Sequence, residues 1–245
     1  MKDEENPAPS LDVPLHPSSL IPHPFSTPFP VAAILLAAGR SRRMGAFKPL
    51  LPFGAHTVVE TCVRNLLAAG ACEVVVVVGH RGEEVRAHLS HLPVRLALNH
   101  EAESEMGVSV ARGVEALSAG DAAEGAPSCE TAAGAVLIAL ADHPAVGSAE
   151  IAEVCAAYRR TGARFVVPEW QGRGGHPVLV SLQLRASLLR LDAAGGLRAL
   201  ISAHASEVLR LPVASPFIAR DMDTWEDYRA LHEEVFGVPP PVTQT

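Results

Sequence analysis

The run Glu73–Val78 (Glu-Val-Val-Val-Val-Val) most constrains what this 245-residue chain can fold into. An uninterrupted apolar run of strand length is typical of a strand buried on both faces, as in a parallel sheet covered by helices. The runs Val31–Ala37 and Ala135–Ala141 have the same character. Three such strands predict a sheet that needs helical cover on both sides.

Helical patterns lie between the apolar runs and supply that cover. In Thr57–Ala69 the apolar residues recur at helical spacing, Thr57 and Glu60 form a predicted capping box, and Gly70 stands where a helix stops. The other expected strands are Val94–Leu98 and Arg164–Val167, with a hairpin at Gln171–Ser181. The other expected helices are Glu83–Leu89, Gly107–Ser118, Ser148–Arg160, Leu182–Ala203 with a break at Gly195-Gly196, and Thr224–Phe236 with Thr224 and Asp227 as a cap pair. This alternation predicts a single α/β domain with a doubly wound, mostly parallel sheet and a small β-excursion.

The two ends of the chain differ from the middle in composition. Residues 1–30 hold eight of the twenty prolines, mixed with Ser and His, which predicts a disordered leader. The folded domain is expected over 31–236. Residues 237–245 begin Gly-Val-Pro-Pro-Pro and predict a flexible tail.

Charge and cysteine usage narrow the class of protein. A net charge of −7 gives no basic field for nucleic acid or an anionic membrane. No run reaches the roughly 18 apolar residues of a membrane span, and the acidic start is unlike a signal peptide. Four cysteines without metal-ligand spacing are expected to be reduced thiols. The prediction is a cytoplasmic protein with neither nucleic-acid nor membrane partners.

The loop after the first strand predicts an anion site. Small residues at Ala37, Ala38 and Gly39 let backbone amides approach a ligand closely. Four cations follow within nine residues, at Arg40, Arg42, Arg43 and Lys48. The spacing fits neither the Walker loop nor the dinucleotide fingerprint. Amides combined with guanidinium and ammonium groups suit a triphosphate, and a solvated basic turn is the alternative.

Two carboxylates stand where strands end or helices begin. Asp142 follows a buried strand, and Asp223 precedes the last predicted helix. Mg²⁺ prefers one or two carboxylates together with phosphate oxygens and water, so these residues are candidate metal ligands. The alternatives are a turn residue at Asp142 and a helix cap at Asp223.

The segment Leu36–Pro52 has the pattern L-A-A-G-x-S-x-R-M-G-x-x-K-x-L-L-P, which resembles the signature of the MobA-like nucleotidyltransferases and, within them, the molybdenum cofactor cytidylyltransferase branch. Leu140–Pro144 resembles the family's LADQP segment with His143 in place of glutamine. Asp221–Asp227 resembles its DIDTPED segment with Trp225 in place of proline. The resemblance implies a Rossmann-like fold with Asp142 and Asp223 as metal ligands. The catalytic residues that it implies are Arg40, Arg43, Lys48 and Asp142.

Two further segments resemble the family's substrate sites. Asn99 with Glu105–Ser109 resembles its N…GMxxS segment near the base and ribose, and Gly172–Pro177 resembles its GRRGHPVLF stretch, which faces the pterin. An ordinary strand–loop–helix turn and a Gly-rich hairpin are the alternatives. The implied nucleotide-binding residues are Leu36, Ala37, Ala38, Gly39, Arg40, Lys48, Asn99, Gly107 and Ser109, and the implied acceptor-binding residues are Gly175, His176 and Pro177.

The resemblance implies an enzyme that uses Mg²⁺ to transfer CMP from CTP to a molybdopterin-type molybdenum cofactor, with release of pyrophosphate. The choice of CTP depends on Ala38, because guanylyltransferase relatives tend to read LAGG at this turn. The alternatives are a GTP-using guanylyltransferase and a nucleotidyltransferase for another phosphorylated acceptor. Two non-enzyme alternatives are a nucleotide-binding chaperone that hands cofactor to a molybdoenzyme, and an adaptor acting through the leader.

Overall fold

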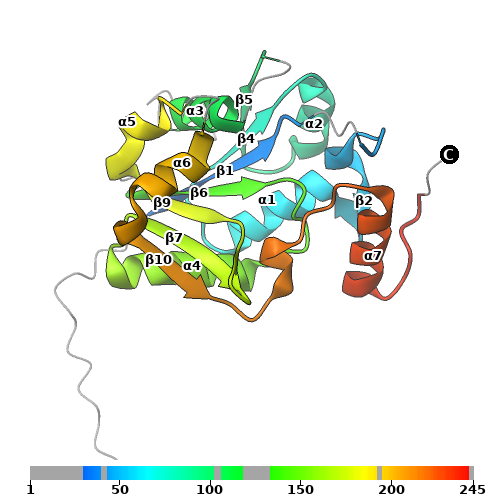
Figure 1. Ribbon diagram of the computed structural model, residues 1–245. Helices are drawn as coiled ribbons and strands as arrows, with labels where there is room; N and C mark the ends of the chain where they lie inside the picture. The colour runs from blue at the N-terminus through cyan, green and yellow to red at the C-terminus, as the bar shows by residue number, and fades with distance from the viewer. Residues whose placement is uncertain (1–29, 40–42, 102–105, 118–132, 192–194, 243–245) are drawn as a thin grey trace, which may run out of the picture.

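The computed structural model describes residues 30–39, 43–101, 106–117, 133–191 and 195–242, and the folded part is one α/β unit with helices on both faces of a central sheet (Figure 1). The sheet order is β10-β7-β9-β6-β1-β4-β5, with β8 paired to β7. The strands are β1 Val31–Ala37, β4 Val74–Val78, β5 Arg95–Leu98, β6 Ala135–Leu140, β7 Phe165–Trp170, β8 Arg173–Gly174, β9 Val178–Ser181 and β10 Val208–Pro212.

The pairing confirms the expected doubly wound, mostly parallel sheet. β1 pairs in parallel with β4 and β6, β4 pairs in parallel with β5, and β10 pairs in parallel with β7. β9 is antiparallel to both β6 and β7. The predicted β-excursion at 171–181 therefore supplies β8 and then returns the chain into the main sheet as β9.

Alternate residues of β1 divide between the two apolar cores. Val31, Ala33 and Leu35 pack with α1 (Val58–Ala68), α2 (Gly82–Leu89) and α4 (Ser148–Thr161). Ala32 and Ile34 pack on the opposite face. That face is covered by α3 (Met106–Ala116), α5 (Arg185–Leu188) and α6 (Gly196–Ala203). A strand with apolar side chains on both faces needs cover on both sides, which is why the valine runs predicted this architecture.

Some local predictions differ from the structure. β10 was not predicted, because this edge strand carries Arg210 and Pro212 and lacks an apolar run. Within the helical stretch expected over 182–203, α6 begins at the expected break at Gly195-Gly196, but α5 ends earlier than expected, at Leu188. At the start of α1 the Thr57 hydroxyl accepts from the Glu60 N–H at 3.3 Å, but the Glu60 carboxylate turns to Arg64 (2.9 Å), so the capping box is half formed.

The cysteine prediction is wrong in part. Cys62 and Cys155 are buried free thiols, as expected, but Cys72 is disulfide-bonded. Cysteine spacing says which metal motifs are absent, but not which thiols the fold brings together. No helix in the described ranges has the length and apolar character needed to cross a membrane.

Close packing of α3 on β1 gives a test of this fold. A Cβ added at Gly113 would lie 2.5 Å from Ile34 Cγ2 in the middle of the sheet. We therefore expect Gly113→Ala to lower the free energy of unfolding by about 1–3 kcal/mol, as overpacking does in cores. Urea denaturation measures this, and in an Ile34→Ala background the added methyl should cost much less. A gain in stability, as expected for an open helix position, would contradict the packing.

Candidate functional site

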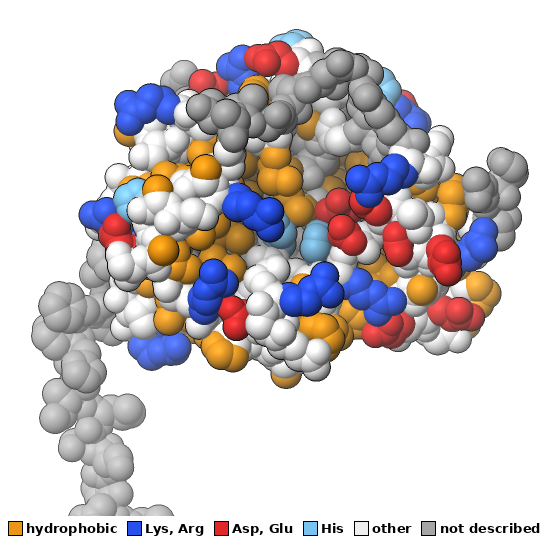
Figure 2. Space-filling model, viewed as in Figure 1, with side chains coloured by type: hydrophobic (Ala, Val, Ile, Leu, Met, Phe, Trp, Pro, Cys, Tyr) orange, Lys and Arg blue, Asp and Glu red, His pale blue; other side chains and the backbone are white. Residues whose placement is uncertain are grey.

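The site lies at the carboxyl edge of the parallel strands. Adjacent strands end in register there, with Ala37 opposite Val78, Val78 opposite Leu98, and Leu36 opposite Leu140. In open α/β sheets this edge is where ligands bind. On this face of the molecule, histidine side chains lie in a central hollow with cationic and acidic side chains around them (Figure 2).

Asp223 lies between two cations of the loop after β1. The Lys48 ammonium, at the start of the short helix Lys48–Leu50, donates to Asp223 Oδ1 at 2.7 Å, and its side chain is 11% exposed. The Arg43 guanidinium donates to Asp223 Oδ2. The Lys48 hydrogen bond, with the Lys48 and Arg43 charges, holds the pKa of Asp223 below its usual range against the opposing effect of burial. The carboxylate is therefore ionised at neutral pH.

Asp142 is the second carboxylate of the site. It follows β6, and the adjacent Ala141 N–H donates to the Leu36 carbonyl at 3.1 Å, which ties its turn to the end of β1. Asp142 Oδ1 is buried without a hydrogen-bond partner among the described residues, and His143 Nε2 lies 3.7 Å away. Burial raises the pKa of Asp142. The charges of His143 and Lys48 lower it, and that of Asp223 raises it further. The ionisation of Asp142 therefore depends on the charges of both Lys48 and Asp223.

A third apolar cluster holds the segments that carry these charges. It is formed by Met44, Leu51, Phe53, Val58, Met222, Tyr228 and Leu231, with Ala145 and Trp225 packed against it. Its members come from the loop after β1, the turn after Asp142, and the start of α7 (Trp225–Phe236). Met222 is fully buried while its neighbour Asp223 faces the cations. We call this set the site-side core.

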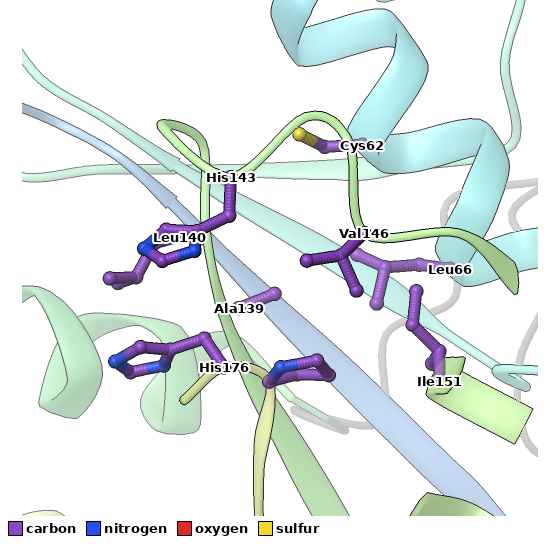
Figure 3. A pocket seen from close by; sticks show the side chains of 9 residues that line it. Cys62, Leu66, Ala139, Leu140, His143, Val146, Ile151 and His176 are labelled. Carbon is purple, nitrogen blue, oxygen red and sulfur yellow. The ribbon is translucent and has the colours of Figure 1, made fainter. Parts of the chain in front are cut away.

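His176 and His143 lie side by side at an apolar hollow. The ring centroid of His176 is 5.5 Å from that of His143, and both side chains line a pocket together with Pro177 and apolar residues of α1 and α4 (Figure 3). Burial, with the His143 charge, lowers the pKa of His176 to about 4, so its imidazole is neutral at pH 7. A Cβ at Gly175 would lie 2.1 Å from the Ile218 carbonyl oxygen, so only glycine fits this turn.

Asn99 and Ser109 meet at the other end of the same edge. Asn99 follows β5, and its Nδ2 donates to Ser109 Oγ on α3 at 2.9 Å. The Asn99 Oδ1 accepts from the Glu101 N–H at 3.0 Å, so its amide is held in one orientation. Gly79 links this region to the loop after β1, since a Cβ there would lie 2.8 Å from the Ala38 carbonyl oxygen.

The structure brings most of the predicted residues to one edge of the sheet. The side chains of Leu36 and Ala37 pack in the core, so only their backbone groups remain for a ligand. Gly39 has open space around its Cα, and Gly107 is buried at the start of α3. Arg40 lies outside the described residues. Sequence reasoning missed Gly79 and the part that Tyr228 and Trp225 play in the site-side core; the apolar and aromatic spacing of the last helix was the available signal.

The donor set fits a hard divalent cation. Within the described ranges no three His, Cys, Asp or Glu side chains form a metal-binding group. The site instead offers two carboxylates, one of which has an unpartnered buried oxygen. Two carboxylates suit a cation that completes its shell with phosphate oxygens and water.

Two carboxylates with a buried lysine and an exposed arginine at the carboxyl edge of such a sheet are typical of a protein that handles nucleoside phosphates. Residues 33–208 match the model of the MobA-like NTP transferase domain. The chain belongs to this family, and its enzyme class is nucleotidyltransferase. The match ends before Asp223.

Individual proteins similar to this chain include one named nicotine blue oxidoreductase from Paenarthrobacter nicotinovorans. The two are 30% identical over 213 residues, which cover 82% of this chain and 96% of that protein. Among solved structures, Rv0371c from Mycobacterium tuberculosis H37Rv is 25% identical, with a TM-score of 0.72 over 84% of this chain and 99% of that one. The same protein was also solved with manganese, at 22% identity and a TM-score of 0.68. A nucleotidyl transferase from Methanothermobacter thermautotroptrophicus shares the fold, with 23% identity and a TM-score of 0.70 over 84% of this chain and 98% of that one.

The unpartnered Asp142 oxygen gives a test of the site. A raised pKa means that ionised Asp142 destabilises the metal-free fold above its folded pKa and has no such effect below its ordinary value of 3.8. We expect Asp142→Asn to raise Tm at pH 7 in EDTA by about 2–4 °C, the shift that about 1 kcal/mol produces in a domain of this size. The gain should disappear as the pH falls below about 4.

Thermal unfolding followed by circular dichroism checks this, with the exposed Asp221→Asn as the matched control. A lower Tm for Asp142→Asn at pH 7 would mean that the carboxylate is well stabilised in the metal-free protein.

Proposed function

We propose that the chain transfers CMP from CTP to a molybdopterin-type molybdenum cofactor and releases pyrophosphate. The observation that supports nucleotidyl transfer most is the pairing of Lys48 and Arg43 with Asp223, near Asp142, whose Oδ1 has no hydrogen-bond partner among the described residues. Cations and carboxylates so arranged suit the positioning and charge screening of a triphosphate.

In the proposed reaction an acceptor oxygen displaces pyrophosphate from the α-phosphorus. A phosphate monoester acceptor is ionised near pH 7, so no dedicated base is needed. Lys48 is held in place by Asp223 and screens the negative charge that builds up on the phosphates. Arg43 is more exposed than Lys48, with 75% of its side chain accessible, and is available to contact the leaving pyrophosphate.

Asp142 and Asp223 are the proposed ligands of Mg²⁺. When bound, the ion would neutralise phosphate charge and orient the triphosphate. Both Asp223 oxygens already accept from a cation, but each carboxylate oxygen has a second lone pair for a further partner. Asp142 has an oxygen available without losing any hydrogen bond.

The proposed base site is the Asn99–Ser109 pair with the turn Ala37–Gly39, and the proposed acceptor site is Gly175, His176 and Pro177. The neutral His176 imidazole suits a hydrogen bond to a heterocyclic acceptor. Arg40 and Gly107 remain proposed nucleotide contacts on the family resemblance alone. A GTP-using enzyme, another phosphorylated acceptor, and a cofactor chaperone for a molybdoenzyme are the alternatives.

A second candidate function is redox chemistry at the same nucleotide site. It is favoured by the similarity to the protein named nicotine blue oxidoreductase, which covers 82% of this chain. Oxidation of NADH or NADPH with an aromatic dye as acceptor would support it. Loss of this activity on substitution of Lys48 would place it at the same site.

The proposed location is the cytoplasm. The disulfide at Cys72 counts against this location, because disulfides are rare in cytosolic proteins.

Pyrophosphate release from CTP, GTP, ATP and UTP, each with Mg²⁺ and molybdenum cofactor, tests the proposal. We expect turnover with CTP at least tenfold above the other nucleotides, and none when EDTA replaces Mg²⁺. A preference for GTP would overturn the cytidylyl assignment. Absence of turnover with every nucleotide would overturn the proposed transfer reaction.

Lys48→Ala tests the proposed role of the buried lysine. Removal of one preorganised cation from a charge-developing transition state typically costs about 10²–10³ in kcat. We expect a loss of this size in the pyrophosphate assay. Arg164→Ala is the matched control, since Arg164 pairs with Glu207 at the opposite edge of the sheet. Equal turnover in both variants would remove Lys48 from the mechanism.

A further inference from the structure

One face of α7 is attached to the chain segment that follows β1. Trp225, Tyr228 and His232 are spaced i, i+3 and i+7, so they lie on one side of the helix. The Trp225 indole N–H donates to the Met44 carbonyl at 2.9 Å, and the Tyr228 hydroxyl donates to the Pro52 carbonyl at 2.6 Å. The Gly54 N–H donates to His232 Nε2 at 3.4 Å. Three side chains of α7 are thus hydrogen-bonded to three backbone groups within residues 44–54.

The three contacts hold different parts of that segment. Pro52 and Gly54 belong to the small hairpin formed by β2 (Pro52–Phe53) and β3 (His56–Thr57). Met44 belongs instead to the cation-bearing loop, next to Arg43 and four residues before Lys48. Of the three α7 residues, Trp225 is therefore the one that contacts the loop that carries Arg43 and Lys48.

The Trp225 bond lies beside the ion pairs of the site. On one side of the bond, Met44 follows Arg43; on the other, Trp225 is two residues from Asp223. Met44 is 3% exposed and packs in the site-side core, and the Trp225 ring packs against this core and against Tyr228, with ring centroids 5.7 Å apart. The hydrogen bond from the Trp225 indole to the Met44 carbonyl therefore links the chain segment that carries Asp223 to the chain segment that carries Arg43.

The side chain at this position also distinguishes the chain from the pattern that it resembles. Trp225 is the first residue of α7 and stands where the DIDTPED pattern has proline. Proline suits the first helical position, but it has no side-chain donor for the Met44 carbonyl. Tryptophan at this position adds a contact to the loop that the helix start alone does not need.

We propose that Trp225 is a positioning residue for triphosphate binding: its indole N–H fixes the loop at Met44 and so keeps Arg43 and Lys48 in place to receive phosphate oxygens. This inference rests on the proposed function, since it assigns the loop to a triphosphate. Because Trp225 acts through the loop, its loss weakens nucleotide binding and leaves the chemical step nearly unchanged.

The test compares the full chain with Trp225→Phe, which keeps an aromatic ring but removes the donor. Tyr158→Phe is the matched control, because it removes a part-buried hydroxyl that donates to the Gly134 carbonyl (3.0 Å) and also contacts Ser181, without touching the loop. Binding of CTP with Mg²⁺ is measured by isothermal titration calorimetry, kcat and KM by pyrophosphate release, and cleavage after Arg43 by limited trypsin digestion. Melting temperatures report overall stability.

We expect Trp225→Phe to raise Kd and KM for CTP about three- to tenfold, the effect of one hydrogen bond, with kcat within twofold of wild type. Cleavage after Arg43 should be at least three times faster than in wild type, while Tyr158→Phe changes neither quantity at a similar melting temperature. Wild-type Kd and cleavage rate in Trp225→Phe would overturn the proposal, as would an equal loss of binding in Tyr158→Phe.

If wild type binds none of the four nucleotides, the proposed function has failed. The cleavage comparison then decides by itself whether Trp225 fixes the loop, and unchanged cleavage overturns that claim too.

Discussion

Asp223 between Lys48 and Arg43 is the interaction on which the candidate site depends. Two carboxylates near one another repel, and Oδ1 of Asp142 is buried with no hydrogen-bond partner in the described structure. Lys48 offsets part of this repulsion, since its charge favours the ionised form of both carboxylates. Without the lysine the ionised pair would be costly to hold at the edge of an apolar sheet.

The site-side core explains how this arrangement is held. Its residues come from segments far apart in the chain, around 44–58, 145 and 217–231. It is distinct from the two cores that cover the faces of the sheet. The family match ends at residue 208, whereas Asp223, Met222 and α7 all follow it. The charged site therefore depends on a C-terminal segment outside the matched domain.

The sequence predicts the fold well because the valine runs and helix caps are local signals. β1 has the predicted bounds, and Thr224 with Asp227 forms the predicted cap pair of α7 as a complete capping box. β10 and the Cys72 disulfide were missed, because an edge strand and a disulfide depend on neighbours that are distant in sequence. Motifs in the sequence identified the candidate residues, but they did not indicate which of these residues contact one another. Nothing in the order of residues indicates that Trp225 reaches Met44, since that contact joins positions 181 apart.

The metal-free state and the nucleotide-bound state place different demands on the same cations. Lys48 and Arg43 hold Asp223 in the structure, and a triphosphate would draw on both of them. A divalent ion on the carboxylates would replace the positive charge that Asp223 loses when the cations turn to phosphate. Ion and triphosphate would then favour each other's binding, because each relieves a charge that the other leaves uncompensated. Asp142 fits this exchange, since its free oxygen gives the ion a ligand before any existing ion pair has to open.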